Sequence, residues 1–350
     1  MPVGIPYALL AAALFGASTP FAKILAGQIA PVLLAGLLYM ASGLGLTGWM
    51  LLRSILRQGR TGIGGGLQKA DFPWLGGAIL TGGIAGPVLL MIGLTLTPAS
   101  TASLLLNTEG VFTALLAWIV FRENVDRRIF IGMLLIVAAG VLLSWEQQPA
   151  LGVPWGAIAI VAACLCWAVD NNLTRKVSGS DAVQIAAVKG LVAGSVNLTI
   201  AWAMGMSVPS SLAMLSAGIV GLCGYGLSLV MFVLALRHLG TARTGAYFSA
   251  APFVGASLSL LLLGETPTPM FWGAAVLMGV GIWLHLTETH GHRHEHESMF
   301  HAHSHRHDEH HQHDHAIGWD AKKPHTHAHE HAPLTHTHAH FPDIHHRHTH

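Results

Sequence analysis

"LTLTPASTASLLLNTEGVFTALLAWIVFRE" (94–123) and "LRHLGTARTGAYFSAAPFVGASLSLLLLGE" (236–265) have the same layout in the two halves of this 350-residue chain. Each runs from the end of one apolar segment, through a short polar loop and a second apolar segment, to Glu123 or Glu265. A shift of 142 residues, from Leu94 to Leu236, superposes them without a gap. Identities are few, so the layout, more than the residues, predicts an internal repeat.

The composition separates a membrane body from a polar tail. Hydrophobic residues make up 52% of the chain and charged residues only 10%, whereas soluble domains carry about 25% charged residues. The apolar runs stop near residue 287, and all histidines except His238 and His285 lie beyond it. The three cysteines fall in apolar segments without a CxxC spacing, so they predict buried packing residues and no disulfide framework.

A helix needs about 20 apolar residues to cross the hydrocarbon core of a bilayer. On that criterion we predict an all-α polytopic membrane protein with ten transmembrane helices and a disordered tail. The two five-helix repeats should occupy residues 1–145 and 146–287, and the His-rich tail 288–350. Because five is odd, the second repeat must enter the membrane from the opposite side, which gives inverted repeats. The predicted spans are 5–25, 31–52, 73–94, 99–121, 129–145, 155–175, 182–204, 211–236, 243–263 and 269–287.

The basic residues predict the orientation of the spans, since cytoplasmic loops carry an excess of Lys and Arg. The loops after the odd-numbered spans contain none. We therefore expect a multi-pass protein of the inner membrane with both termini, and the tail, in the cytoplasm. The loops after the even-numbered spans contain Arg53, Arg57, Arg60, Lys69, Arg122, Arg127, Arg128, Arg175, Lys176, Arg237 and Arg243.

The motif "ALFGASTPFAK" (13–23) in the first span and the 236–265 unit with its earlier counterpart resemble the EamA family of the drug/metabolite transporter superfamily. The resemblance covers about residues 5–287. It implies secondary transport, usually export of metabolites, amino acids or toxic organic compounds across the bacterial inner membrane. It names no substrate, and the tail lies outside it.

Charged residues within spans indicate a functional or structural role, because inserting each one at the bilayer centre costs roughly 2.5–3.5 kcal/mol on insertion scales. Glu109, with Asn107 nearby, lies mid-span in "LLLNTEGVF", and Lys189 lies in "QIAAVKGLVAG". We interpret Glu109 and Lys189 as opposite charges that face a central cavity. They would hold a zwitterion, or Glu109 would carry a coupling proton. The alternatives are a structural ion pair between the two helices, or a lysine that extends to the interface.

Three further residues are candidates for the same cavity. Asp170 and Asn171 lie near the inner end of a span in "WAVDNNLTRK", and Tyr247 follows the "RTGAY" turn. Asp170 has a competing interpretation, because it lies one turn from Arg175 at what could be a solvated helix end. Tyr247 has one too, since packing against helices or lipid would explain it equally well.

The tail consists largely of His-x-His repeats such as "HAHSHRHDEHHQHDH" (301–315). In an extended chain alternate residues lie on one face, about 6.5–7 Å apart, and neutral imidazole binds Zn²⁺, Ni²⁺, Cu²⁺ and Co²⁺. We expect a disordered segment that binds divalent metal without a unique site. It would collect or sense metal for an exporter, respond to pH as a polycation, or only buffer metal. The candidate ligands are His292, His294, His296, His301, His303, His305, His307, His310, His311, His313, His315, His325, His327, His329 and His331.

The sequence favours a transporter over an enzyme, because it contains no phosphate-binding GxxxxGK[ST] loop and no assembled Ser/His/Asp or Cys/His grouping. The expected partners are lipid, a small-molecule substrate and divalent metal ions, with no nucleic acid and no required cofactor; a homodimer is left open. Only His285 among the histidines lies in a span. Export of an organic solute is therefore favoured over two alternatives, a divalent metal exporter fed or gated by the tail and a non-transporting metal or pH sensor.

Overall fold

The computed structural model divides into two units, Met1–Glu288 and Thr289–His350, which are described separately. It describes residues 4–56, 66–121, 127–146 and 154–286 of the first unit, and residues 291–296, 299–305, 325–331 and 334–339 of the second.

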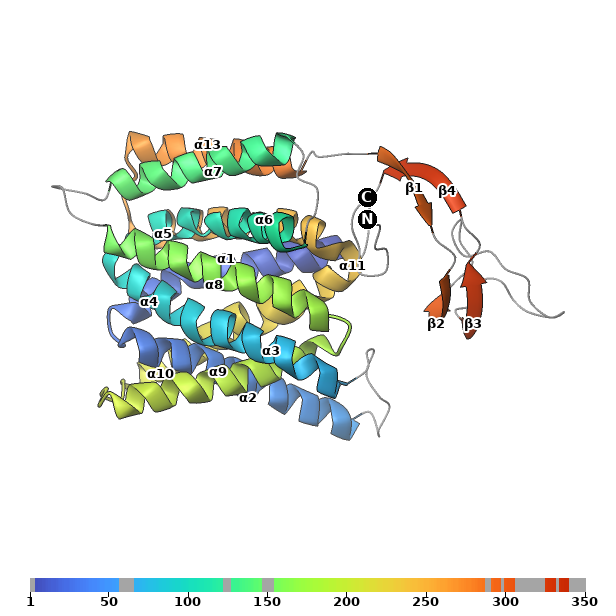
Figure 1. Cartoon of the computed structure of the whole chain (residues 1–350). Helices are drawn as coiled ribbons and strands as arrows, with labels where there is room; N and C mark the ends of the chain where they lie inside the picture. Colours follow the sequence, from blue (N-terminus) through green and yellow to red (C-terminus); the bar gives the residue numbers. More distant parts are fainter. Residues whose placement is uncertain are drawn as a thin grey trace. The chain divides into compact units, whose positions relative to one another are not determined.

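The described part of the first unit is helical throughout, as the sequence predicts (Figure 1). Six helical stretches are long and apolar enough to cross a membrane, and three shorter apolar helices accompany them. Large side chains such as Leu44, Leu80 and Leu261 are exposed on this body, as lipid-facing residues are. The helices are α1 (Gly4–Ala26), α2 (Pro31–Leu56), η1 (Lys69–Asp71), α3 (Phe72–Ala78), η2 (Ile79–Ala85), α4 (Gly86–Leu96), α5 (Ala99–Leu105), α6 (Thr108–Phe121), α7 (Arg127–Glu146), α8 (Trp155–Val177), α9 (Ala182–Ala203), α10 (Ser211–Val220), η3 (Gly221–Leu227), α11 (Ser228–Phe248), α12 (Ala251–Leu263) and α13 (Pro269–Leu286).

Two of these stretches contain a π-helical turn, η2 between α3 and α4 and η3 between α10 and α11. They are related by the same 142-residue shift as the quoted sequences. In η2 the amide of Gly86 donates to the carbonyl of Thr81, five residues back. Pro87 has no amide to donate to Gly83. The carbonyls of Gly82 and Gly83 are therefore left for side chains of other helices.

The predicted span 99–121 is not one continuous helix, because a turn at Leu106 and Asn107 separates α5 from α6. Tight i→i−3 bonds form there, from Asn107 to Leu104 and from Glu109 to Leu106. The Thr108 hydroxyl donates to the Leu105 carbonyl, so a side chain provides a hydrogen bond to a backbone carbonyl at the end of α5.

The sequence predicted a loop between the spans 211–236 and 243–263, but α11 continues through this region to Phe248. The chain turns later, at residues 249–250, before α12. Pro252, in the first turn of α12, has no amide to bond with the preceding turn. This turn and the one between α5 and α6 lie at nearly equivalent positions of the proposed repeats.

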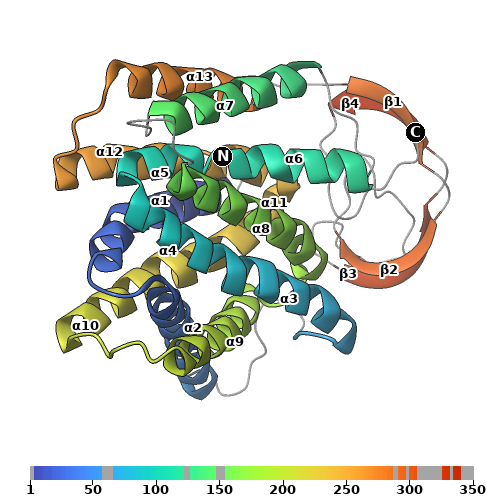
Figure 2. The ribbon, with the colours of Figure 1, turned by 60° about the vertical axis from the view of Figure 1, so that its left-hand side comes forward.

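Helices of the two halves pack against each other in related pairs (Figure 2). α2 lies along α9 and α7 along α13, while α1 packs on α11 and α4 packs on α8. The α2–α9 crossing is close because glycines face backbone. A Cβ added to Gly43 would lie 2.4 Å from the Leu191 nitrogen, and one added to Gly194 would lie 2.5 Å from the Met40 nitrogen. Small residues that let backbones approach are typical of helix contacts in lipid.

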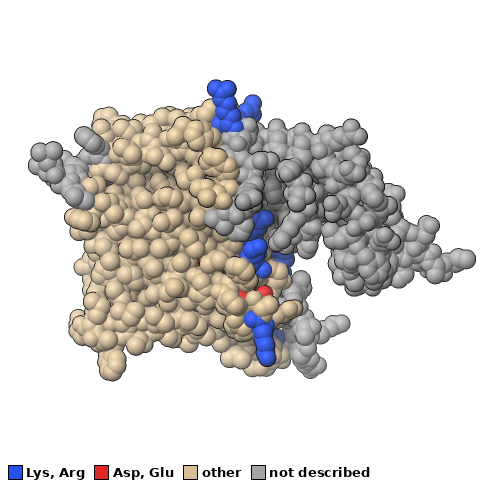
Figure 3. Space-filling view, viewed as in Figure 1, with Lys and Arg blue, Asp and Glu red and all other residues tan. Residues whose placement is uncertain are grey.

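The charged side chains visible in Figure 3 lie at one end of the helical body. In Figure 3 the visible Lys and Arg side chains lie along the end where α2 ends and α3 begins, and the remaining visible surface of the body is almost entirely uncharged. Among the residues there, Arg53, Lys69 and Lys176 come from loops predicted to be cytoplasmic. The distribution is the one expected for a membrane-spanning body with a cytoplasmic end.

The described part of the tail forms two antiparallel two-stranded ladders, where the sequence suggested no regular structure. β1 (Gly291–His296) pairs with β4 (Leu334–Ala339), and β2 (Met299–His305) pairs with β3 (His325–His331). The register places histidines opposite one another, for example His303 opposite His327. Isolated two-stranded ladders are at best marginally stable in water, so disorder in solution stays a prediction.

The α2–α9 contact predicts a large difference between two glycines of α2. Gly43→Ala should lower the free energy of unfolding by about 1–3 kcal/mol, because the new methyl group meets backbone that cannot rotate away. Gly48, which has nothing within 4 Å of an added Cβ, is the matched control. Gly48→Ala should leave stability unchanged or raise it by up to about 1 kcal/mol. Thermal unfolding of the purified protein in detergent compares them, and equal unfolding temperatures would contradict the described crossing.

Candidate functional site

A cavity lies between the two halves of the helical body. It encloses about 500 Å³ of empty space, a figure that includes the open mouth and the solvent in it. Its wall combines charged and aromatic side chains from α1, α2, α6, α8, α9, η3 and α11. The lining residues are Phe15, Tyr39, Glu109, Trp167, Asp170, Asn171, Lys189, Gly224, Tyr225, Ser228, Leu229, Phe232 and Phe248.

Lys189 and Asp170 form a buried ion pair between α9 and α8. The Lys189 ammonium donates to both carboxylate oxygens of Asp170 at 2.5 Å, and the two residues are 1% and 5% exposed. Thr174, one turn further along α8, also donates to Asp170 at 2.9 Å. A buried pair of this kind offsets the desolvation of each charge only while both partners are present.

Glu109 has a different environment from Asp170. It is the second residue of α6, directly after the turn that separates α5 from α6, and its side chain is half-buried against the cavity. Asn171 donates to its Oε1 atom at 2.6 Å. Among the described residues no lysine or arginine lies within ion-pair distance of Glu109.

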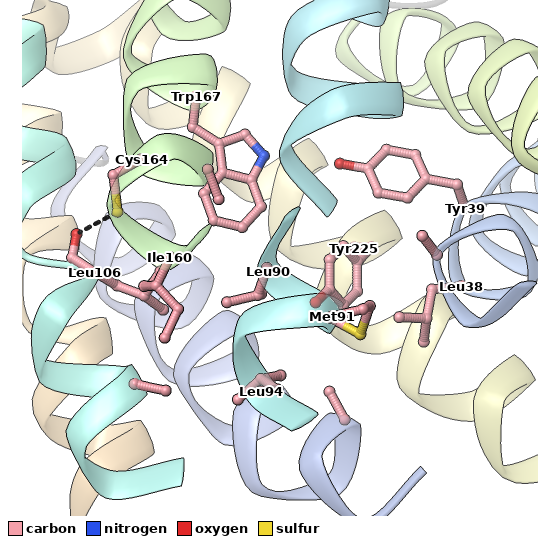
Figure 4. Packing of buried hydrophobic residues seen from close by; sticks show 14 of the residues in the cluster. Leu38, Tyr39, Leu90, Met91, Leu94, Leu106, Ile160, Cys164, Trp167 and Tyr225 are labelled. Atoms are coloured by element: carbon pink, nitrogen blue, oxygen red, sulfur yellow. Dashed lines mark hydrogen bonds between the residues drawn. The ribbon is translucent and has the colours of Figure 1, made fainter. Parts of the chain in front are cut away.

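Tyr39 and Trp167 line the cavity, and in Figure 4 the Trp167 indole nitrogen and the Tyr39 hydroxyl point toward each other. The Tyr39 hydroxyl and the Trp167 indole N–H donate to the same acceptor, the carbonyl of Gly82 in η2, at 2.7 and 3.0 Å. Asn197 of α9 donates to the adjacent Gly83 carbonyl. The π-helical turn thus provides the backbone acceptors that fix side chains from α2, α8 and α9. Gly82 itself has no room for a side chain, because an added Cβ would lie 1.9 Å from Asp170.

Phe15 of α1 is the centre of an aromatic cluster that spans the cavity. Its ring lies 5.8 Å from that of Trp167, 5.9 Å from Tyr225 and 5.6 Å from Phe248, measured between ring centroids. Phe248 in turn contacts Phe232, edge to face, at 4.9 Å. Within the described part of the chain, the cavity therefore has one carboxylate without a cationic partner, one neutralised ion pair and a wall of aromatic rings.

Comparison with known proteins agrees with this fold. The model of the EamA-like transporter family matches the chain over residues 2–145 and again over residues 154–287. The chain belongs to the EamA-like transporter family. A solved crystal structure has a TM-score of 0.60 at 18% identity, covering 80% of this chain and 95% of that one, which supports the fold alone.

Three relatives of this EamA-like transporter illustrate its similarity to known proteins. An uncharacterized transporter of Methanothermobacter thermautotrophicus is 28% identical over 283 residues, which cover 77% of this chain and 82% of that protein. The uncharacterized inner membrane transporter YedA of Escherichia coli K12 is 24% identical over 253 residues, covering 69% and 77%. The probable 4-amino-4-deoxy-L-arabinose-phosphoundecaprenol flippase subunit ArnE of Pseudomonas fluorescens is 32% identical over 108 residues, covering 31% and 94%. The chain is a membrane transporter and not an enzyme.

The structure of this EamA-like transporter changes how the sequence-predicted residues combine. Glu109 and Lys189 both line the cavity, but Lys189 is held by Asp170, so the alternative of a structural ion pair between Glu109 and Lys189 does not apply. Which residues pair depends on which faces of α6, α8 and α9 meet in the folded protein. The spacing of the residues along the chain does not show which faces meet. Asp170 is buried rather than a solvated helix end beside Arg175.

Two predicted residues lie outside the cavity wall. Asn107 is buried in the turn before α6, where its side-chain amide donates to the Met278 sulfur at 3.6 Å. Tyr247 packs against the cluster of Ala8, Ala235 and Leu239, and its neighbour Phe248 lines the cavity.

The sequence analysis missed most of the aromatic wall. Trp167, Tyr39 and Tyr225 lie mid-span, away from the interfacial belt where Trp and Tyr normally gather. Their mid-span position was the available signal. Phe15 and Phe232 gave none, because a phenylalanine in an apolar span is ordinary.

The predicted metal ligands of the tail cannot be compared with the structure. His307, His310, His311, His313 and His315 lie outside the described residues, and no side-chain position is described for the histidines of β1 to β4. Where side chains are described, no group of three or more His, Cys, Asp or Glu is placed to hold a metal ion.

The ion pair predicts strong coupling between its two residues. Lys189→Met should destabilise the protein by about 3–5 kcal/mol, because it leaves the Asp170 carboxylate buried without a partner. Adding Asp170→Leu should restore stability to within about 1 kcal/mol of the original chain, since an apolar pair needs no compensation. Thermal unfolding of the two single variants and the double variant measures this coupling. Additive losses would show that the two residues are not partners.

Proposed function

We propose that this transporter exports a small organic solute across the inner membrane by alternating access between two inverted five-helix repeats. The cavity with Glu109 at its wall is the substrate site. Transport would be driven by an ion gradient or by the gradient of the solute itself. The single observation that carries the proposal is a cavity that contains a half-buried carboxylate inside a body otherwise built for lipid.

The arrangement of the helices supports alternating access. The π-helical turns η2 and η3 and the turns before α6 and α12 lie at equivalent or nearly equivalent positions of the two halves. Interrupted helices at the junction of repeats are common around transporter substrate sites. Lys23 of α1 donates to the carbonyls of Leu94 and Thr97, and Glu265 accepts from the amides of Ala99 and Ser100. The Glu265 bonds join the two halves, and the Lys23 bonds tie α1 to the end of α4 beside them, as expected for a state closed on that side.

The charge distribution supports a topology with both termini in the cytoplasm. The basic residues of the described loops gather at one end of the helices, and the positive-inside rule assigns that end to the cytoplasm. The YedA relative is named an inner membrane transporter, which agrees with the proposed location.

Transport should depend on Glu109. In cells that express the transporter, Glu109→Gln should abolish tolerance to the exported solute, because the amide keeps the shape of the side chain and removes its charge. The solute is found by challenging expressing and control cells with amino acids, toxic organic compounds and divalent metals. Asp71→Asn is the control, since Asp71 is a carboxylate in the short helix before α3 that does not line the cavity. Full tolerance in Glu109→Gln at normal protein abundance would remove Glu109 from the site.

The tail is tested separately, because its metal-binding role is a second proposal. Deleting residues 290–350 should lower tolerance to Ni²⁺, Co²⁺, Zn²⁺ or Cu²⁺ while export of the organic solute persists. Such a result would make the tail a metal-binding module attached to an organic-solute exporter. Loss of both activities would support the alternative of a metal exporter fed by its tail, and unchanged metal tolerance would contradict a metal-linked role.

A further inference from the structure

We infer that the substrate is an organic cation, an ammonium group on an apolar body, bound by Glu109 and the aromatic wall. This inference rests on the proposed function, since it names the class of solute for the same cavity. It follows from three properties of the lining residues: their net charge, the engagement of their hydrogen-bond donors and the faces of their rings.

The first property is the net charge of the wall. The ammonium of Lys189 is bonded to both oxygens of Asp170, so these two charges cancel. Among the residues whose contacts are described, Glu109 receives only the neutral amide of Asn171. The ionised wall therefore carries one uncompensated negative charge, and a cation in the cavity would supply the missing partner. An isolated carboxylate in an apolar environment is costly, and an opposite charge close to it removes much of that cost.

The second property is that the donors of the wall are already engaged. Tyr39 and Trp167 donate to the Gly82 carbonyl, and Ser228 donates to the Ala11 carbonyl at 2.9 Å. An anionic or carbonyl-rich solute needs free donors or a free cation, and these three donors are held in bonds within the protein.

The third property is the set of ring faces that remain. With their polar atoms bound to Gly82, Tyr39 and Trp167 contribute aromatic surface, and Phe15, Phe232 and Phe248 have no polar atom at all. The negative faces of such rings attract ammonium groups, most strongly when the site excludes water.

Binding of a matched set of probes tests the inference with the full-length protein in detergent. Benzyltrimethylammonium is the cationic probe, benzyl alcohol the neutral one and phenylacetate the anionic one, and calorimetry measures each dissociation constant. We expect the cation to bind at least about tenfold more tightly than the other two, because it gains both the carboxylate and the ring faces. Equal or tighter binding of phenylacetate or benzyl alcohol overturns the inference without any variant.

Variants then assign the binding to the cavity. Glu109→Gln should weaken binding of benzyltrimethylammonium at least about tenfold, and Phe15→Leu about threefold to tenfold, as expected for a desolvated carboxylate and one lost ring. Asp71→Asn should bind it as the original chain does. Thermal unfolding identifies any variant that is misfolded, in which case the probe series on the original chain decides. Unchanged binding in a folded Glu109→Gln protein overturns the inference.

The outcome is separable from that of the proposed function. If cells export a neutral, zwitterionic or anionic solute in a Glu109-dependent manner while the cationic probe does not bind, the substrate class is wrong and the transporter proposal stands. If no solute is exported in a Glu109-dependent manner, the proposed function itself fails.

Discussion

The ion pair between Lys189 and Asp170 is the interaction on which the cavity depends. It joins α8 to α9 inside the helical body and cancels two charges that the surrounding apolar side chains could not tolerate singly. It also decides which charge remains, because Lys189 is no longer available to Glu109. Gly82 belongs to the same arrangement, since any side chain there would displace Asp170. The chemistry of the cavity therefore follows from which carboxylate holds the lysine.

The irregular backbone of η2 is the second constraint. In hydrocarbon, a carbonyl that leaves the regular helical pattern must find another donor within the protein. The Gly82 carbonyl finds Tyr39 and Trp167, and the Gly83 carbonyl finds Asn197. A departure from regular helix thus fixes three helices around one wall of the cavity. Its recurrence in η3 shows that both halves of the chain use the same irregularity.

The sequence predicted the helical membrane body because the length of an apolar run can be read along the chain without knowing how the helices pack against one another. It also identified Glu109, Asp170 and Lys189 as candidate site residues, since charged side chains within membrane spans are costly and rare. It did not predict their pairing, because each residue along a helix turns the side chain by about 100°, and contacts depend on how helices rotate against one another. The same sensitivity explains why Phe248, one residue after Tyr247, reaches the cavity.

Chemical modification of the two acidic residues tests the central claim most directly. A hydrophobic carbodiimide reacts with protonated carboxyl groups inside apolar regions, and mass spectrometry of the purified protein locates the modified residues. Both oxygens of the buried Asp170 accept from the Lys189 ammonium, whereas the half-buried Glu109 lines the cavity, so the reagent reaches Glu109 more easily. The described geometry predicts modification at Glu109 and none at Asp170. Modification of Asp170 with Glu109 untouched would contradict it.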